Sequence, residues 1–328
     1  MLRAMLDSHS QLAIPPESHF LSRLARRSCQ ARLERRRGFD RELFVDMVTG
    51  HPRFAYWEMS SADVHDALGE GYLDLAEAIR RIYLRYAARH GKDRYGDKTT
   101  QHITAIRSLA RLFPEAKFIH LIRDGRDVAL SQLSIPEWGA STVEDAALSW
   151  RQRVRAARRA GARLGTGRYF ELSYERLVGE PDDTLRGVCA FIGVEFEDRV
   201  LEFHRQGAVV AASMRYPQHH RRLTLPATAG LRHWRREMSG NDIDLYDSIA
   251  GPTLRAAGYT TSRGGRSLGG FRAIARSYGH GAWNNVRAAR RRILNRRALD
   301  QLIRARIGSA HRSHGEVSLR GEAQSRHA

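Results

Sequence analysis

The segment Phe118–Ser131, which reads FIHLIRDGRDVALS, constrains the fold more than any other part of the sequence. Residues Lys117–Ile122 are mostly apolar, as expected of a strand that is buried on both faces. The turn Arg123–Gly125 follows directly, and a helix is expected over Arg126–Leu133. A buried strand that passes through a short turn into a helix is typical of α/β folds with a parallel sheet.

Other strands and helices alternate with this segment at the spacing such a fold requires. We expect helices at Met1–Ser8, His19–Arg37, Arg41–Val48, Tyr72–Arg89, Gln101–Leu112, Val143–Leu164, Asp182–Ile192 and Ile243–Ala257. We expect further strands at Leu12–Ile14 and Arg168–Leu172, and one that ends near Tyr95 beside the central strand. The order predicts a three-layer α/β/α fold with a parallel sheet, whose ligands bind at the carboxyl ends of the strands.

Arg123 lies at the carboxyl end of the central strand, and Ser131 follows it by about two helical turns. A guanidinium fork and a hydroxyl on one side of a pocket suit a phosphate dianion. The alternative is an ordinary strand-turn-helix with a surface arginine and a serine inside a helix, because short motifs often match by chance.

Two other charged residues are placed to reach the same edge of the sheet. Lys98 follows the strand that ends near Tyr95, and its ammonium group could neutralise a departing phosphate or sulfate oxygen. Glu17 follows Pro15 and Pro16, whose fixed backbone can hold a carboxylate in a cleft. Taken singly, each could instead be a solvated surface side chain.

These segments, in this order, resemble the sulfotransferase superfamily over about residues 1–260. The closest resemblance is to bacterial sulfotransferases that use 3′-phosphoadenosine 5′-phosphosulfate (PAPS), and to tyrosylprotein sulfotransferases. The matching stretches are LRAMLDSH, the glutamate at position 17, the lysine at position 98, RDGR with its later serine, SYERL at Ser173–Leu177, and HWRR at His233–Arg236. The resemblance implies a sulfotransferase fold, similar to that of P-loop NTPases, and transfer of a sulfuryl group from PAPS to an acceptor hydroxyl.

The resemblance also implies a role for each matching residue. Arg123 and Ser131 would hold the 3′-phosphate of PAPS, and Tyr174 would lie near its adenine. Glu17 would be the general base, and Lys98 would stabilise the leaving oxygen.

Three residues have weaker matches to the family pattern. His19 is a second candidate base, since some family branches use histidine, although tyrosylprotein enzymes have arginine there; a surface histidine is the alternative. Arg236 is a candidate phosphate contact. Trp234 is expected in the core rather than as a stacking platform.

The family's PRSGTT-type loop, which grips the sulfate end of the donor through backbone N–H groups, has no counterpart in this sequence. In the family pattern, Met1 stands directly after that loop, so the first strand and the loop are expected to be missing. A start codon assigned too far downstream and a genuine truncation both explain this. Without the loop, we expect weak PAPS binding and impaired transfer, and a pseudoenzyme that binds PAPS or another anion is the alternative.

The net charge of +19 is concentrated near the end of the sequence. Ser262–Ala328 holds fifteen arginines against three acidic residues. We therefore divide the chain into a sulfotransferase domain at 1–260 and a basic extension at 261–328. That extension is expected to hold a linker, an amphipathic helix at Trp283–Ile307 and a disordered tail. The helix could dock on nucleic-acid phosphates or on an anionic membrane surface, or it could cap the domain; of these partners, nucleic acid is the less expected.

The cysteine content and the apolar pattern limit the kinds of site and the cellular location that we expect. Two cysteines, Cys29 and Cys189, exclude a disulfide framework and a multi-cysteine zinc site, and no metal is expected. No long apolar run or secretory signal occurs, so we expect a cytoplasmic protein.

A kinase of related fold would need a Walker lysine, which is not visible. The acceptor could be a carbohydrate, a phenol, a peptide or a lipid hydroxyl.

Overall fold

The structure is a computed structural model that describes residues 1–35, 38–135, 139–206, 223–227 and 233–262. The expected helix Trp283–Ile307 and almost all of the basic extension lie outside these ranges, so the division at residue 260 stays a prediction. Within the described ranges, no helix is long and apolar enough to cross a membrane.

The described strands form two parallel pairs and one antiparallel pair. Strand β5 (Phe118–Ile122) lies parallel to β6 (Tyr169–Ser173) along its whole length, and β1 (Leu12–Ala13) lies parallel to β4 (Arg94–Tyr95). The short strands β2 (Glu34–Arg35) and β3 (Gly38–Phe39) are antiparallel. We expected the strand ending near Tyr95 to pair with the central strand. It pairs with β1 instead, because backbone hydrogen bonds join Arg94 to Gln11 and Gly96 to Ala13.

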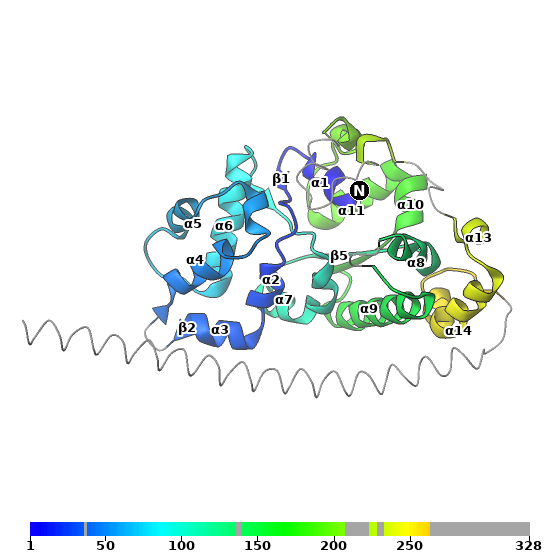
Figure 1. The fold of residues 1–328 in the computed structure, drawn as a ribbon. Helices are drawn as coiled ribbons and strands as arrows, with labels where there is room; N and C mark the ends of the chain where they lie inside the picture. Colours follow the sequence, from blue (N-terminus) through cyan, green and yellow to red (C-terminus); the bar gives the residue numbers. More distant parts are fainter. Residues whose placement is uncertain (36–37, 136–138, 207–222, 228–232, 263–328) are drawn as a thin grey trace, which may run out of the picture. The chain divides into compact units, whose positions relative to one another are not determined.

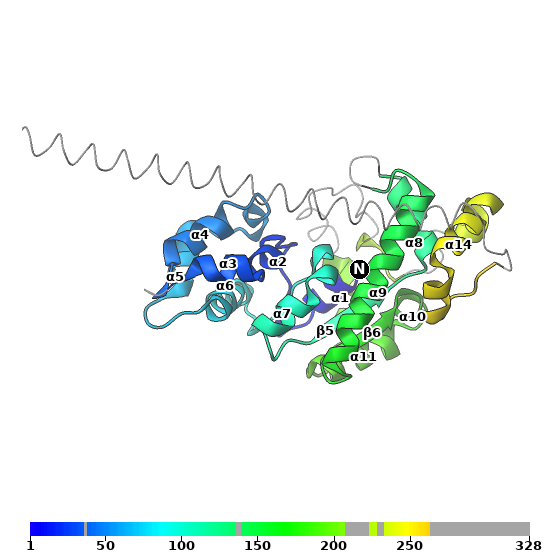
Figure 2. The same cartoon turned by 90° about the horizontal axis from the view of Figure 1, so that it is seen from below.

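Helices cover both faces of the β5–β6 pair, as Figure 1 shows. On one face, α1 (Leu2–Asp7), α10 (Tyr174–Gly179) and α11 (Pro181–Ile192) enclose a core that includes Met5, Leu172 and Leu185. On the other face, α7 (Ile106–Leu112) and α9 (Val143–Leu164) pack against Phe118. Figure 2 shows the long helix α9 running across the strands. The predicted α/β architecture with parallel strands and flanking helices is confirmed.

Most helices lie where the sequence predicts them. The described helices not yet introduced are α4 (Arg41–Thr49), η1 (Phe54–Trp57), α5 (Ser61–Leu68), α6 (Leu75–Arg89), α8 (Gly125–Leu133), η3 (Asp198–Val200), η4 (Phe203–Gln206), α13 (Trp234–Glu237) and α14 (Gly240–Ala256). Two predicted helices are interrupted. The first becomes α2 (Phe20–Leu24) and α3 (Arg27–Leu33), since Arg26 has extended backbone angles. The second becomes η2 (Thr100–Thr104) followed by α7.

A second core lies among α2 to α7 and is rich in aromatic rings. Trp57 packs edge-on against Tyr83 at 4.8 Å between ring centroids, and Phe20 lies 5.4 Å from Trp57. Aromatic pairs in these arrangements add stabilisation beyond their buried area. This core fixes the position of Trp57, which in turn holds the loop that carries Glu17.

Candidate active site

Three of the predicted site residues meet at one place. The ammonium group of Lys98 donates a hydrogen bond to Glu17 Oε1, and His19 Nε2 lies 2.8 Å from Glu17 Oε2. Lys98 follows β4 by three residues, so its side chain starts near the carboxyl end of a parallel strand, as expected. The Lys98 side chain is 47% exposed and the Glu17 side chain 23%, so solvent and ligands can reach the pair.

The electrostatics of this cluster favour an ionised glutamate. Partial burial raises the pKa of the Glu17 carboxyl, but the Lys98 ammonium and the hydrogen bonds from Lys98 and His19 outweigh it. The net effect lowers the pKa of Glu17 below its usual value of 4.5. Glu17 is therefore a carboxylate at neutral pH, the form that can accept a proton.

The loop that presents Glu17 is held on two sides. Arg3 Nε of α1 donates to Ile14 O at 3.0 Å, and Asp7 Oδ1 accepts from Ile14 N at 2.8 Å. Trp57 Nε1 donates to Pro16 O at 2.9 Å from the aromatic core. The two prolines are buried and restrict the backbone between these contacts. The carboxylate of Glu17 is thus presented from a fixed loop.

His19 has a backbone conformation that few non-glycine residues adopt, with φ at 46°. It stands at the start of α2, and its ring stacks on that of His51 at 6.3 Å with planes 12° apart. Strained residues of this kind often occur at functional sites, where the surrounding structure holds them in place. Here the imidazole of His19 lies within hydrogen-bond distance of the Glu17 carboxylate.

Asp97 ties the Lys98 loop to the Glu17 loop, and sequence reasoning missed it. Its side chain is 9% exposed and accepts hydrogen bonds from Tyr83, from Thr99 at 2.8 Å and from His102 at 2.7 Å. Thr99 Oγ1 in turn accepts from Ser18 N at 3.1 Å, next to Glu17. Burial raises the pKa of Asp97, but His102 and the other hydrogen bonds prevail and lower it to about 2. The network sets the distance between Lys98 and Glu17.

Two further predicted residues meet at the carboxyl ends of β5 and β6. The Arg123 guanidinium lies 4.7 Å from the centre of the Tyr174 ring, within cation–π range. Arg123 Nε is buried and, within the described residues, has no hydrogen-bond partner. An unsatisfied buried donor is costly, and a phosphate oxygen would satisfy it. The residues present therefore fit a phosphate group, as the 3′-phosphate of PAPS would supply.

A cavity of about 270 Å³ opens beside Arg123 and Tyr174. It lies between the end of β5, α8, α9 and η2, the last of which begins two residues after Lys98. The lining residues are Ile103, His120, Leu121, Ile122, Arg123, Val128, Gln132, Trp150, Arg153, Val154 and Tyr174. Apolar and aromatic surface with a few converging polar groups is the usual lining of a small-molecule site.

Ser131 and Arg236 are not brought to this cavity in the structure. Ser131 is half-buried on α8, but Val128 and Gln132 are the residues of that helix that line the cavity. Arg236 is exposed on α13. Trp234, which we expected in the core, is half-buried, and the Arg126 guanidinium stacks 3.5 Å from its ring centre. The roles of Ser131 and Arg236 stay predictions.

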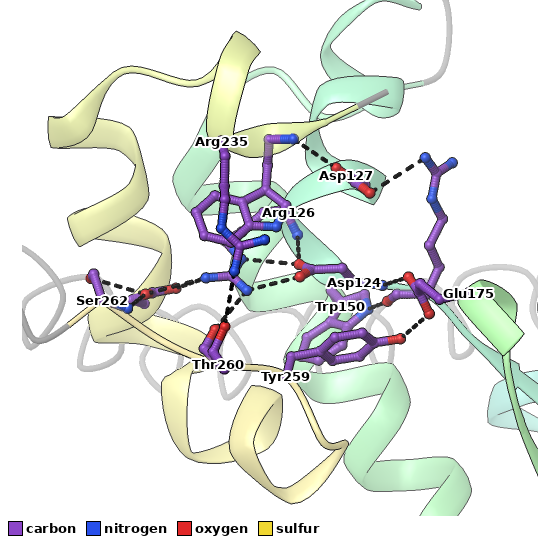
Figure 3. A network of polar contacts seen from close by, with 12 residues as sticks. Asp124, Arg126, Asp127, Trp150, Glu175, Arg235, Tyr259, Thr260 and Ser262 are labelled. Carbon is purple, nitrogen blue, oxygen red and sulfur yellow. Dashed lines mark hydrogen bonds and ion pairs between the residues drawn. The ribbon is translucent and has the colours of Figure 1, made fainter. Parts of the chain in front are cut away.

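The turn that carries Arg123 is anchored by the polar network in Figure 3. The side chain of Arg126 is 1% exposed and pairs with Asp124 at 2.8 Å and with Asp247 of α14 at 3.3 Å. Asp247 also accepts from Ser262 N at 2.6 Å. A buried arginine is tolerated only when paired in this way, so the network joins the RDGR turn to α14.

A second branch of the network joins the ends of β5 and β6. Glu175 accepts hydrogen bonds from Asp124 N at 2.9 Å and from the Tyr259 hydroxyl at 2.7 Å. Asp127 accepts from Trp234 N at 2.9 Å and lies 3.6 Å from Arg123. Apart from Arg123 and Asp127, which are four residues apart, these partners have no local sequence signal, because they are far apart in the chain. Only the fold brings them around Arg123.

Comparison with known proteins identifies relatives of the chain. A model of the sulfotransferase family matches residues 1–198. Protein-tyrosine sulfotransferase 2 of Gallus gallus is 24% identical over 208 residues, which cover 61% of this chain and 49% of that protein. Protein-tyrosine sulfotransferase 1 of Danio rerio is also 24% identical, over 61% of this chain and 51% of that protein. The match therefore spans about half the length of these curated relatives.

A solved structure shares the fold. The sulfotransferase domain from the curacin biosynthetic pathway superposes with a TM-score of 0.51 at 21% identity. The superposition covers 79% of this chain and 93% of that domain. The predicted fold class is thereby confirmed. The contacts that Trp234, Asp247 and Tyr259 make around Arg123 come from beyond the stretch that the family model matches.

Proposed function

The chain belongs to the sulfotransferase family, and from this premise we propose that it moves a sulfuryl group from PAPS to an acceptor hydroxyl. The observation that carries the proposal is the pairing of Lys98 with Glu17 in one cluster, together with Arg123 Nε at the carboxyl end of β5, which no described residue satisfies. A base, a cation for the leaving group and a phosphate ligand are three of the groups that such a transfer uses.

Glu17 is the proposed general base. Its carboxylate accepts the proton of the acceptor hydroxyl while the oxygen of that hydroxyl forms a bond to sulfur. The bond from sulfur to the bridging phosphate oxygen breaks on the opposite side, and Lys98 stabilises the negative charge on the departing oxygen. His19, hydrogen-bonded to the second oxygen of Glu17, orients the carboxylate and offers a second base.

Arg123 is the proposed ligand of the 3′-phosphate, and Tyr174 the neighbour of the adenine. Recognition of the 3′-phosphate distinguishes PAPS from ATP. Ser131 is proposed as a further ligand of the same phosphate, and Arg236 as an outer contact. The donor is a co-substrate, and no metal takes part in the proposed reaction.

The proposed acceptor is a phenolic hydroxyl of a peptide tyrosine, since relatives of the chain are named protein-tyrosine sulfotransferases. A phenol has a pKa near 10, so a carboxylate base removes its proton more readily than that of an alcohol. Carbohydrate and lipid hydroxyls are the competing acceptors. We also propose a cytoplasmic location.

Calorimetric binding to two nucleotides tests the donor assignment. We expect the chain to bind adenosine 3′,5′-bisphosphate more tightly than adenosine 5′-monophosphate, without Mg²⁺, because only the first carries the phosphate for Arg123. A charge-assisted hydrogen bond predicts a preference of roughly tenfold or more. Equal binding of the two nucleotides, or a requirement for Mg²⁺, would instead favour a kinase-like nucleotide site.

A further inference from the structure

The cavity beside Arg123 has a second arginine in its wall. Arg153 and Val154 follow Trp150 on α9 by three and four residues, so both lie beside Trp150 on the helix surface, and all three line the cavity. Arg153 is exposed. Among the described residues it forms no ion pair with an acidic side chain, whereas Arg158 of the same helix pairs with Glu171 through Nε at 2.8 Å.

The cavity wall favours an anion. Among the described residues that line it, Arg123 and Arg153 carry positive charge and none is acidic. His120 also lines the cavity. Burial lowers the pKa of its ring to about 4, so the ring is neutral at pH 7. Arg123 Nε is buried and unpartnered in the described part of the chain. Two guanidinium groups beside one space offer a phosphate dianion more than one pair of parallel hydrogen bonds.

The rest of the wall suits a nucleoside. Trp150 and Tyr174 offer aromatic surface, and Ile103 and Val154 offer apolar surface. Gln132 adds an amide that can both donate and accept. The volume of about 270 Å³ is near the lower limit of small-molecule sites, so it holds part of a donor molecule rather than the whole.

We propose that Arg153 of α9 binds the 3′-phosphate of the donor together with Arg123. The inference rests on the proposed function, because it assumes a nucleotide with a 3′-phosphate. It adds a ligand that the sequence did not single out, since Arg153 lies in a helix with many surface arginines. The fold distinguishes it from those neighbours by placing it on the face that lines the cavity.

Arg153→Gln tests the proposal, with Arg155→Gln as the matched control. Arg155 lies two residues further along α9, is exposed and does not line the cavity. For the full chain, we expect Arg153→Gln to weaken binding of adenosine 3′,5′-bisphosphate by roughly tenfold to a hundredfold. Binding of adenosine 5′-monophosphate should be unchanged, and Arg155→Gln should affect neither nucleotide. Arg153→Lys should restore part of the affinity, since it keeps the charge but not the fork.

The possible outcomes distinguish a failure of the inference about Arg153 from a failure of the proposed function. If wild type prefers the bisphosphate and Arg153→Gln behaves like Arg155→Gln, the inference is overturned and the proposed function stands. An equal loss for both nucleotides also overturns it, because Arg153 would then contact a part that they share. If wild type shows no preference for the bisphosphate, the proposed function and the inference both fail. Unchanged thermal unfolding of each variant confirms that binding alone is affected.

Discussion

The Lys98 ammonium donates a hydrogen bond to Oε1 of Glu17, across 81 residues of sequence. His19 holds the other carboxylate oxygen at 2.8 Å. The glutamate is therefore ionised and oriented before any substrate arrives. In the proposed reaction the same lysine also stabilises the leaving group, so one cation would serve both the base and the departing oxygen.

Glu17→Gln should abolish most of the transfer and leave donor binding intact. The amide keeps the size of the side chain but cannot accept the proton, so we expect a rate loss of about 10²–10⁴-fold. Affinity for adenosine 3′,5′-bisphosphate should stay within about twofold, because Arg123 rather than Glu17 is the proposed ligand of the 3′-phosphate. The exposed Glu70 provides the control, and Glu70→Gln should change neither quantity. A normal rate in Glu17→Gln would exclude Glu17 as the base.

The pKa of Glu17 should depend on Lys98. In the wild type it lies below 4.5, because Lys98 and His19 outweigh the effect of burial. Lys98→Met removes the ammonium and leaves burial, which favours the neutral acid, so the pKa should rise. An NMR titration of the Glu17 carboxyl carbon measures this without requiring activity. A pKa that does not move on this substitution would show that the pair is not formed in solution.

Asp97 should contribute stability that is lost in acid. Its pKa is lowered from 3.8 to about 2 in the folded chain, so the unfolded chain binds the proton first as the pH falls. The contribution, about 2 kcal/mol, is present in full at neutral pH and disappears between pH 3.8 and about 2. Chemical denaturation across this range should show the loss in wild type but not in Asp97→Asn.

The control for Asp97 is the exposed Asp66 on α5. Asp66→Asn should leave both the free energy of unfolding and its acid dependence nearly unchanged. Identical curves for Asp97→Asn and wild type would mean that the network around Asp97 adds nothing to stability.

Arg126 should matter for stability far more than surface arginines do. Arg126→Met leaves Asp124 and Asp247 as buried carboxylates without their partner, which costs about 3–5 kcal/mol. Arg176, whose side chain is 68% exposed and pairs with Glu180, is the matched control. Arg176→Met should cost less than about 1 kcal/mol. Denaturant unfolding compares the two, and equal costs would contradict a structural role for the buried network.

The sequence predicted the local elements well, because hydrophobic periodicity and turn residues are local signals. The helix Val143–Leu164 and the strand into Arg123 are where the pattern indicated. Strand pairing was harder to predict: β4 pairs with β1, a choice that depends on contacts about 80 residues apart. The helix expected at His19–Arg37 ends early for a local reason: Glu34 and Arg35 form β2, which pairs with β3 only three to five residues further along the chain.

Sequence reasoning predicted the residues that carry the proposed chemistry but not those that position them. Glu17, Lys98, Arg123 and Tyr174 stand in recognisable motifs, and the structure brings them together in two clusters. Asp97 stands beside Lys98 without a motif of its own, and its partners Tyr83 and His102 are set by tertiary packing. Arg153 is one of several arginines on α9, and only the cavity separates it from the others.

Transfer from PAPS labelled in its sulfuryl group tests the central claim most directly. The full chain is incubated with PAPS and a peptide that contains tyrosine, and product formation is followed by mass spectrometry in wild type and in Glu17→Gln and Arg123→Gln. We expect sulfated peptide and adenosine 3′,5′-bisphosphate to form in equal amounts in wild type. Glu17→Gln should reduce the rate at saturating PAPS. Arg123→Gln should raise the PAPS concentration that gives half of the maximal rate. Transfer that is equally fast in all three proteins would contradict the assignment of this site.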